Sequence, residues 1–151
     1  MDSLNSKREM PLTERNFLVL LLGASRGILE SETRLQKLAF LAIQEMGLQK
    51  FTDFRWEKYG PLSHGIWETS RRMQRQGLLR IIEEDKVTFM GDAYTIRTFE
   101  LTDRGNEELS QTVRSHEKEY ESARRLFSKY GNLSLDRLLN YVHTAYSAND
   151  L

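Results

Sequence analysis

The sequence predicts an α+β fold that is mostly helical. Over most of the chain, apolar residues recur three and four positions apart, as they do on the buried face of a helix. Near the middle, one short apolar run and one partly alternating segment have the features of strands. With 151 residues, the chain is expected to form one domain with a helical extension.

The N-terminal part of the chain predicts two helices. Residues 1–12 are polar and aperiodic, and are expected to form a flexible leader. Thr13 is a suitable N-cap for a first helix, and its apolar run, 17–22, is predicted to be buried on more than one side. A second helix is expected to begin at Ser31 or Thr33 and to end at a glycine.

The middle of the chain predicts a helix followed by a pair of strands. The partly alternating segment 51–59 is expected to contain a short strand, and a third helix is expected over 61–76. The apolar run 78–82 then predicts a strand that returns through 94–101, with a first turn near 84–86. One long irregular hairpin and three short strands are both compatible with the intervening residues.

The C-terminal part predicts two further helices. Thr102 is expected to cap a fourth helix that reaches about Tyr130, and Ser134 is expected to cap the last one. The fourth helix carries an apolar seam with heptad-like spacing, made of Leu109, Val113, His116, Tyr120, Ala123 and Phe127. Such a seam serves either dimerisation or packing within one chain.

The predicted order of elements over 61–105 is helix, two-stranded ribbon, helix. This order is typical of the second half of a winged helix-turn-helix, which offers a helix to the DNA major groove and a hairpin to the flanking backbone. The expected organisation is a winged-helix domain at 13–105 with a C-terminal helical extension at 106–151, a candidate dimerisation element. The connection between the second and third helices is longer than the usual turn of about 3–4 residues, so the module is expected to be an elaborated variant.

Composition limits the classes of function. Lysine plus arginine and aspartate plus glutamate both number 22, so the neutral chain is not expected to bind DNA tightly without specificity. The absence of cysteine excludes disulfides and thiolate metal sites. The longest apolar run is shorter than the roughly 20 residues of a membrane span. The expectation is a soluble protein in the cytoplasm.

The sequence contains no recognisable catalytic or cofactor motif. Its three histidines, His64, His116 and His143, lie on three different predicted helices, and no H-E-x-x-H occurs. A nucleophile elbow, a phosphate loop and G-x-G-x-x-G are also absent. No enzymatic activity, metal or cofactor is therefore expected.

Several segments resemble winged-helix proteins of the YwgA-like and Panacea type. TRLQKLAFL at 33–41 resembles their "LQKL-x-F/Y-L" helix, and FRWEKYGPLS at 54–63 resembles the aromatic-Tyr-Gly-Pro-x-Ser segment that opens their next helix. FELTDRG at 99–105 resembles the exit from the wing in MarR- and PadR-like regulators. LLNYV at 138–142, followed by Tyr146, resembles the closing helix of the YwgA-like group.

The resemblance implies a winged-helix fold and no known catalysis. It also implies a role in gene regulation, antitoxin action or mobile-element defence. The chain departs from the family at its closing helix, which is often followed by a Tyr-Pro step, whereas Ser147 follows Tyr146 here.

The candidate site is a DNA-binding surface on the third helix and its surroundings. Five residues are expected to face the major groove: Ser63, His64, Trp67, Arg71 and Arg75. Five more are expected to touch the DNA backbone: Arg34, Lys37, Arg72, Arg80 and Lys86. The alternatives are a solvated helix face, with Ser63 only a cap, Trp67 in the core and Lys37 exposed to solvent. The expected partners are double-stranded DNA and a second copy of the chain.

The acidic wing favours a rival interpretation. Glu83, Glu84 and Asp85 would approach phosphates with few cations to offset them. Either the wing points away from the duplex or the module recognises a protein instead, for example as an antitoxin that binds a toxin or as an adaptor in a mobile-element system.

Overall fold

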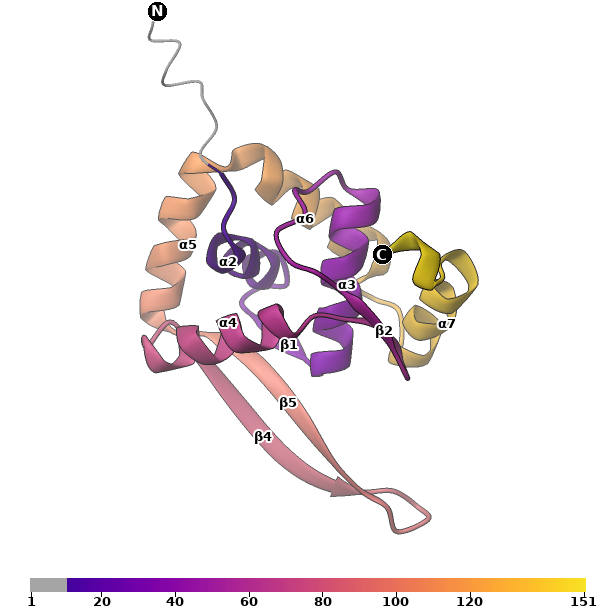
Figure 1. Cartoon of the computed structure of the whole chain (residues 1–151). Coiled ribbons are helices and arrows are strands. Elements are labelled where there is room, and N and C mark those ends of the chain that lie inside the picture. The colour runs from indigo at the N-terminus through magenta and orange to yellow at the C-terminus, as the bar shows by residue number, and fades with distance from the viewer. Residues whose placement is uncertain (1–10) are drawn as a thin grey trace, which may run out of the picture.

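Helix α2 (Glu14–Ala24) lies in the middle of the molecule, and the other long helices are arranged around it (Figure 1). It begins at Thr13, whose hydroxyl accepts a hydrogen bond from the backbone N–H of Asn16 at 3.1 Å. All six residues from 17 to 22 are buried, although an ordinary surface helix buries only one stripe. The expectation that this helix is covered on more than one side is confirmed.

The structure is a computed structural model that describes residues 11–151. It is mixed α+β, 55% helical, with small antiparallel sheets. The leader expected at residues 1–12 lies outside the described part except for its last two residues, and Leu12 is buried in the core. Between residues 11 and 151, no helix combines the length and the apolar character that a bilayer span requires.

The larger sheet has three strands. Strand β1 (Ile28–Glu30) connects α2 to α3 (Glu32–Glu45), and the hairpin of β4 (Leu79–Val87) and β5 (Ala93–Leu101) follows α4 (His64–Arg75). Strand β5 lies between β1 and β4 and is antiparallel to both. Strand β1 is not among the elements expected from sequence, because three residues are too few for alternation to be recognised.

A second, two-stranded sheet occupies the connection between α3 and α4. Strands β2 (Arg55–Glu57) and β3 (Gly60–Leu62) pair antiparallel, with Trp56 opposite Pro61. The short strand expected within 51–59 is therefore confirmed, and the long connection is a small hairpin that leads directly into α4.

The hairpin of β4 and β5 is one long regular ribbon. The first turn expected near 84–86 is wrong, because β4 continues to Val87 and the chain reverses between Thr88 and Asp92. The acidic residues stay in the ladder since their cross-strand neighbours hold them there. Glu83 accepts a hydrogen bond from Arg97 at 2.8 Å, and Asp85 accepts one from Thr95 at 3.0 Å.

The single helix expected from Thr102 to about Tyr130 is two helices. Helix α5 (Asp103–Ser115) and helix α6 (Glu117–Tyr130) are separated by His116, whose backbone leaves the helical region at φ −139° and ψ 54°. The bend allows both helices to pack on α2, which one straight helix could not do (Figure 1). The chain ends with α7 (Leu135–Ala145), capped by Ser134 as expected, and a short 3-10 helix, η1 (Ala148–Asp150).

The heptad-like seam of these helices faces the interior of its own chain. Leu109 lies directly against Gly23 of α2 and leaves no room for a Cβ there. Val113, Tyr120 and Phe127 pack on the core, and Ala123 is buried. The sequence left two roles for this seam, dimerisation and packing within one chain. The structure shows packing within the chain.

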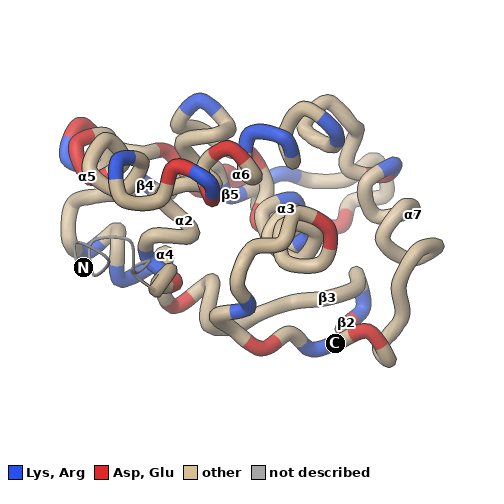
Figure 2. The backbone as a smooth tube through the Cα atoms, turned by 90° about the horizontal axis from the view of Figure 1, so that it is seen from above, with Lys and Arg blue, Asp and Glu red and all other residues tan. Residues whose placement is uncertain are grey.

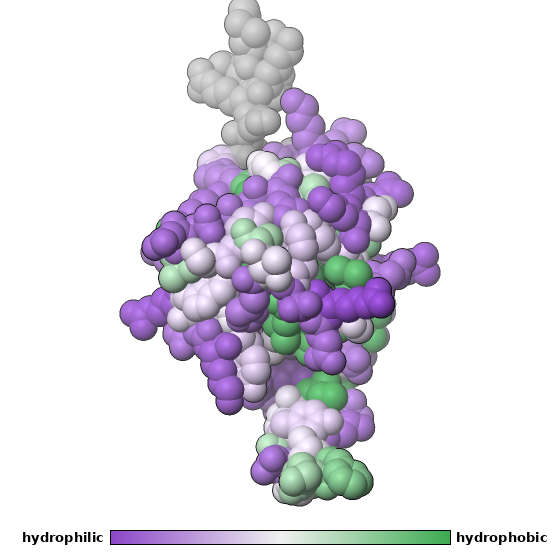
Figure 3. All heavy atoms as spheres, turned by 90° about the vertical axis from the view of Figure 1, so that its right-hand side faces the viewer, coloured by the Kyte–Doolittle hydropathy of each residue, from purple (hydrophilic) through white to green (hydrophobic). Residues whose placement is uncertain are grey.

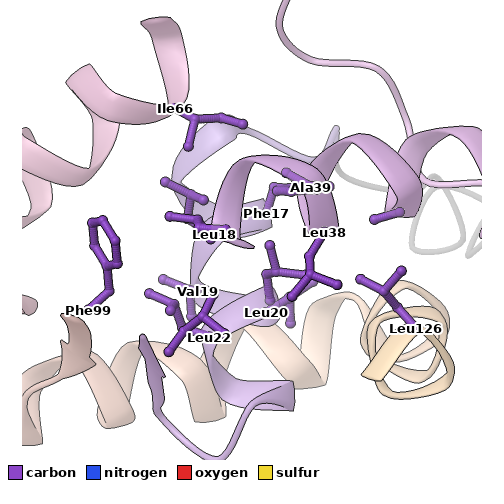
Figure 4. Packing of buried hydrophobic residues seen from close by; sticks show 14 of the residues in the cluster. Phe17, Leu18, Val19, Leu20, Leu22, Leu38, Ala39, Ile66, Phe99 and Leu126 are labelled. Carbon is purple, nitrogen blue, oxygen red and sulfur yellow. The ribbon is translucent and has the colours of Figure 1, made fainter. Parts of the chain in front are cut away.

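One core joins the N-terminal and C-terminal helices. Figure 4 shows Leu18, Val19 and Leu22 of α2 in the same cluster as Phe99 of β5 and Leu126 of α6. The sheet enters this core through Phe99, which pairs with Leu29 on one side and Ile81 on the other. The base of the hairpin is thus fixed to the core, whereas its far end is not.

A partly buried carboxylate joins α3 to the C-terminal helices. Glu45 accepts hydrogen bonds from the hydroxyls of Tyr141 and Tyr146, both at 2.5 Å, and from the hydroxyl of Tyr130. Burial opposes ionisation of Glu45, but the three hydroxyls and the Lys129 ammonium outweigh it and hold the pKa of Glu45 below its ordinary value. Burial and the bond to Glu45 raise the pKa of Tyr130 and Tyr146.

Glu45→Gln is expected to lower the free energy of unfolding by about 1–3 kcal/mol at pH 7, because the neutral amide accepts these hydroxyls less strongly. A lowered carboxyl pKa contributes stability that is present above the unfolded value and is lost as pH falls through the folded value. The difference between wild type and variant should therefore shrink below about pH 4 in urea titrations. Glu121→Gln, at an exposed carboxylate, is the control, and a constant difference at all pH values would contradict the assignment.

Candidate nucleic-acid interface

Two side chains of α3 fix the start of α4. The Gln36 carboxamide donates to the backbone carbonyl of Ser63 at 2.9 Å and accepts from its backbone N–H at 2.8 Å. Both polar groups of one residue are therefore satisfied by one buried side chain. The Ser63 hydroxyl accepts from the backbone N–H of Ile66 and is the N-cap of α4.

Lys37 holds the chain two residues before this cap. Its ammonium donates to the carbonyl of Pro61 at 2.9 Å, and only 1% of the residue is exposed. Desolvation of the ammonium, opposed in part by Glu32, lowers the pKa of Lys37 from 10.5 to about 8. We name Gln36, Lys37 and the backbone of residues 61–63 the α3–α4 clamp.

The clamp corrects two of the site residues expected from sequence. Lys37 is neither a contact to the DNA backbone nor a solvent-exposed cation, because its ammonium is enclosed and bonded to Pro61. Ser63 does not face a groove, because it is buried and its hydroxyl caps α4. The residues that resemble a family signature at 33–41 and 59–63 thus have a positional role.

The outer face of α4 carries most of the remaining candidates. His64, Arg71 and Arg75 are exposed at helical spacing, and Arg72 is exposed beside them. The opposite face buries Ile66, Thr69, Ser70 and Met73. Within residues 11–151, none of the three arginines forms a salt bridge. Their charges therefore face solvent, and within α4 the one acidic residue is Glu68, which is also exposed.

Trp67 lies between this face and the β4–β5 hairpin. The residue is half-buried, and its ring has the Arg71 guanidinium at 5.3 Å and the Arg97 guanidinium at 4.8 Å from its centre. Arg97 also pairs with Glu83 of β4 and Glu32 of α3. Trp67 is thus a support for Arg71 rather than an outward-facing group, and Arg97, which sequence reasoning missed, ties α4 to the β4–β5 hairpin.

The three remaining candidate cations, outside α4, each have a partner within the chain, but the partners differ. Arg34 donates to the carbonyl of Leu133 at 2.8 Å, which directs its guanidinium toward the connection before α7. Arg80 pairs with Glu100 at 2.7 Å across the ribbon, so its charge is largely offset. Lys86 lies 4.0 Å from Glu84 near the end of the hairpin.

Charge is mixed over the surface as a whole. Figure 2 shows segments of Lys and Arg and segments of Asp and Glu interspersed along the backbone, not separated onto two faces. The arginines of α4 are therefore a local cationic patch on a chain without net charge. Among residues 11–151, no three histidine, aspartate or glutamate side chains come together as metal ligands would.

Comparisons of the chain with known protein families, with curated proteins and with solved structures find no match.

Gln36→Leu is expected to destabilise the fold by about 2–4 kcal/mol, because it leaves a buried N–H and a buried carbonyl of Ser63 without partners. The free energy of unfolding in urea is the measurement. Gln44→Leu on the exposed side of the same helix removes one exposed hydrogen bond, to the Asp150 carbonyl; it is the matched control and should change it by less than about 1 kcal/mol. Equal effects of the two substitutions would refute the clamp.

Lys37 should make stability rise with pH in the alkaline range. Its folded pKa of about 8 lies below the unfolded value of 10.5, so the unfolded chain binds more protons between these values. The free energy of unfolding should increase from pH 8 towards pH 10.5, by roughly 3 kcal/mol at most. Lys37→Met should lack this increase, whereas Lys58→Met, at an exposed lysine, should retain it. Parallel pH profiles for wild type and Lys37→Met would contradict the burial of the ammonium.

Proposed function

We propose that the chain is a cytoplasmic winged-helix protein that binds double-stranded DNA and acts as a transcriptional regulator. The order of elements α2, β1, α3, α4, β4, β5, with β5 between the other two strands, supports this assignment. The resemblance to YwgA-like and Panacea-type proteins belongs to the same proposal. In it, α4 is the recognition helix and the β4–β5 hairpin is the wing.

The observation that carries the proposal is the outer face of α4. Arg71, Arg72 and Arg75 are exposed, and none forms a salt bridge within residues 11–151. A guanidinium satisfies the two acceptors of a guanine edge or a phosphate with its planar fork of donors. His64, at the N-terminal end of the same face, is where a recognition helix meets base edges.

The clamp gives this face a fixed position. Because Gln36 and Lys37 hold the backbone before α4, the helix is oriented by α3 and not by a flexible connection. A site built on rigid elements loses less conformational entropy on binding. The contacts proposed are Arg71, Arg75 and His64 with bases, and Arg72 with phosphate. Arg34, Arg80 and Lys86 are left outside the primary set because each already has a partner.

Arg71→Gln is expected to weaken binding to a preferred duplex by about 1–3 kcal/mol, and to weaken binding to random duplex less. The preferred duplex would be selected from a random library by the wild-type protein, and affinity would be measured by fluorescence anisotropy. The wild-type affinity should fall with salt, with a log–log slope of about −0.9 for each phosphate contact.

Arg114→Gln, an exposed arginine on α5 away from the proposed interface, is the matched control and should leave DNA affinity unchanged. The proposal fails if the wild-type protein retains no duplex at low salt. It also fails if Arg71→Gln and Arg114→Gln behave alike.

A second candidate function is a protein-interaction module without strong DNA binding, such as an antitoxin or a defence adaptor. The hairpin favours it, because its shaft is acidic and its end is apolar and exposed. If the protein binds no DNA at any salt concentration, this candidate is supported over the first.

A further inference from the structure

The end of the wing carries hydrophobic side chains that nothing in the described chain covers. Phe89 is fully exposed, and Met90 and Val87 are 81% and 69% exposed. Figure 3 shows hydrophobic atoms gathered at the lower end of the molecule, where the β4–β5 hairpin turns. We name Val87, Phe89 and Met90 the wing tip.

The wing tip cannot fold back onto its own core. Each strand of the hairpin has nine residues, which at roughly 3.3 Å per residue carries the turn about 30 Å from the base. The hairpin is fixed near its base, through Phe99 and its cross-strand neighbours and through the contacts of Arg97 with Glu32 and Trp67. An exposed group of large apolar side chains at the end of a projecting element is typical of an interaction site.

The charge around the wing tip selects the kind of surface that it fits. Glu84, Asp85 and Asp92 are exposed near the tip, against one cation, Lys86, and the charge of Glu83 is offset by Arg97. Phosphates would be repelled by this excess of acidic groups. The complementary surface is therefore a hollow that offers both apolar side chains and cations.

The chain itself has such a hollow on another face. A cavity of about 790 Å³ lies between the end of α2, strand β1 and α6. Its cations are Arg26, Arg124 and Arg125, against one acidic residue, Glu121. Apolar side chains also line it: Ile28, Leu29, Tyr120 and Phe127. The volume lies within the range of roughly 300–1,000 Å³ of pockets that bind small ligands, so side chains of the wing tip fit in it.

We propose that the wing tip of one copy docks into this arginine-lined cavity of a second copy. The cavity adjoins β1, which pairs with the base of the hairpin at residues 98–100, so the tip of the same chain is directed away from it. Phe89 and Met90 contact the apolar side chains of the cavity, while Asp85 and Asp92 meet its arginines. Because every copy has both a tip and a cavity, a two-fold exchange forms both contacts at once and closes the dimer.

This dimer is not a coiled coil of the seam of α5 and α6, whose residues pack on their own core, although two of them, Tyr120 and Phe127, also line the cavity. It does not depend on DNA binding, because it leaves the arginines of α4 uncovered by the contact proposed. Sedimentation velocity over a range of protein concentrations measures it directly, with no DNA present.

The test uses one variant on each side of the contact. Phe89→Asp and Arg125→Glu should each weaken self-association of the wild-type protein by about tenfold or more, since both remove a central contact. Both residues are exposed, so the variants should fold as wild type does by circular dichroism. Tyr59→Asp, at an exposed aromatic residue on the β2–β3 turn, and Arg114→Glu on α5 are the matched controls and should self-associate normally.

Mixing the two variants gives the decisive result. In the mixed pair, the intact tip of Arg125→Glu meets the intact cavity of Phe89→Asp, so one of the two contacts is restored. A heterodimer in the mixture, when neither variant dimerises alone, would support the exchange. The proposal is overturned if the wild-type protein is monomeric at all concentrations, or if both variants dimerise as wild type does. It is also overturned if Phe89→Asp abolishes DNA binding while self-association is unchanged, since the tip would then act on the duplex.

Discussion

The position of α4 depends on one buried amide. The Gln36 side chain pairs with both backbone groups of Ser63, as a neighbouring strand would, and Lys37 adds a bond to Pro61, two residues earlier. These bonds allow the chain to insert the β2–β3 hairpin between α3 and α4 without losing the angle between the two helices. The arginines of α4, the Trp67–Arg97 contact and the direction of the wing all follow from where that helix begins.

Elements with a strong apolar period could be predicted from the sequence, whereas those set by tertiary contacts could not. Thr13, Ser134 and a glycine after α4 mark helix ends correctly, since caps and stops are local signals. The break at His116 is not local, because it is imposed by the packing of α5 and α6 on α2. The turn of the wing was misplaced because charged residues at 83–86 look like a loop until their cross-strand partners are known.

The candidate site likewise has features that follow from the local sequence and features that depend on tertiary contacts. Exposure of Arg71 and Arg75 follows from the helical period, because the opposite face of α4 is apolar or small. Burial of Lys37 could not be foreseen, because a lysine at that position of an amphipathic helix is usually solvated. Lys37 lies in a segment that resembles a family motif, but the motif does not explain why a lysine occupies this position. The explanation is its bond to the carbonyl of Pro61, 24 residues later in the chain. Arg97 was missed for the same reason, since its three partners lie on β4, α3 and α4.

Strand β4 is at the edge of its sheet, and this position has a consequence for how copies of the chain meet. A nine-residue outer strand offers unpaired N–H and carbonyl groups to any other extended segment, and such strands template fibrous stacking. Glu83, Glu84, Asp85 and Lys86 place charge along much of its length, and like charges brought together by stacking would repel one another. The acidic shaft thus protects the ribbon from indiscriminate strand addition while its apolar end stays exposed.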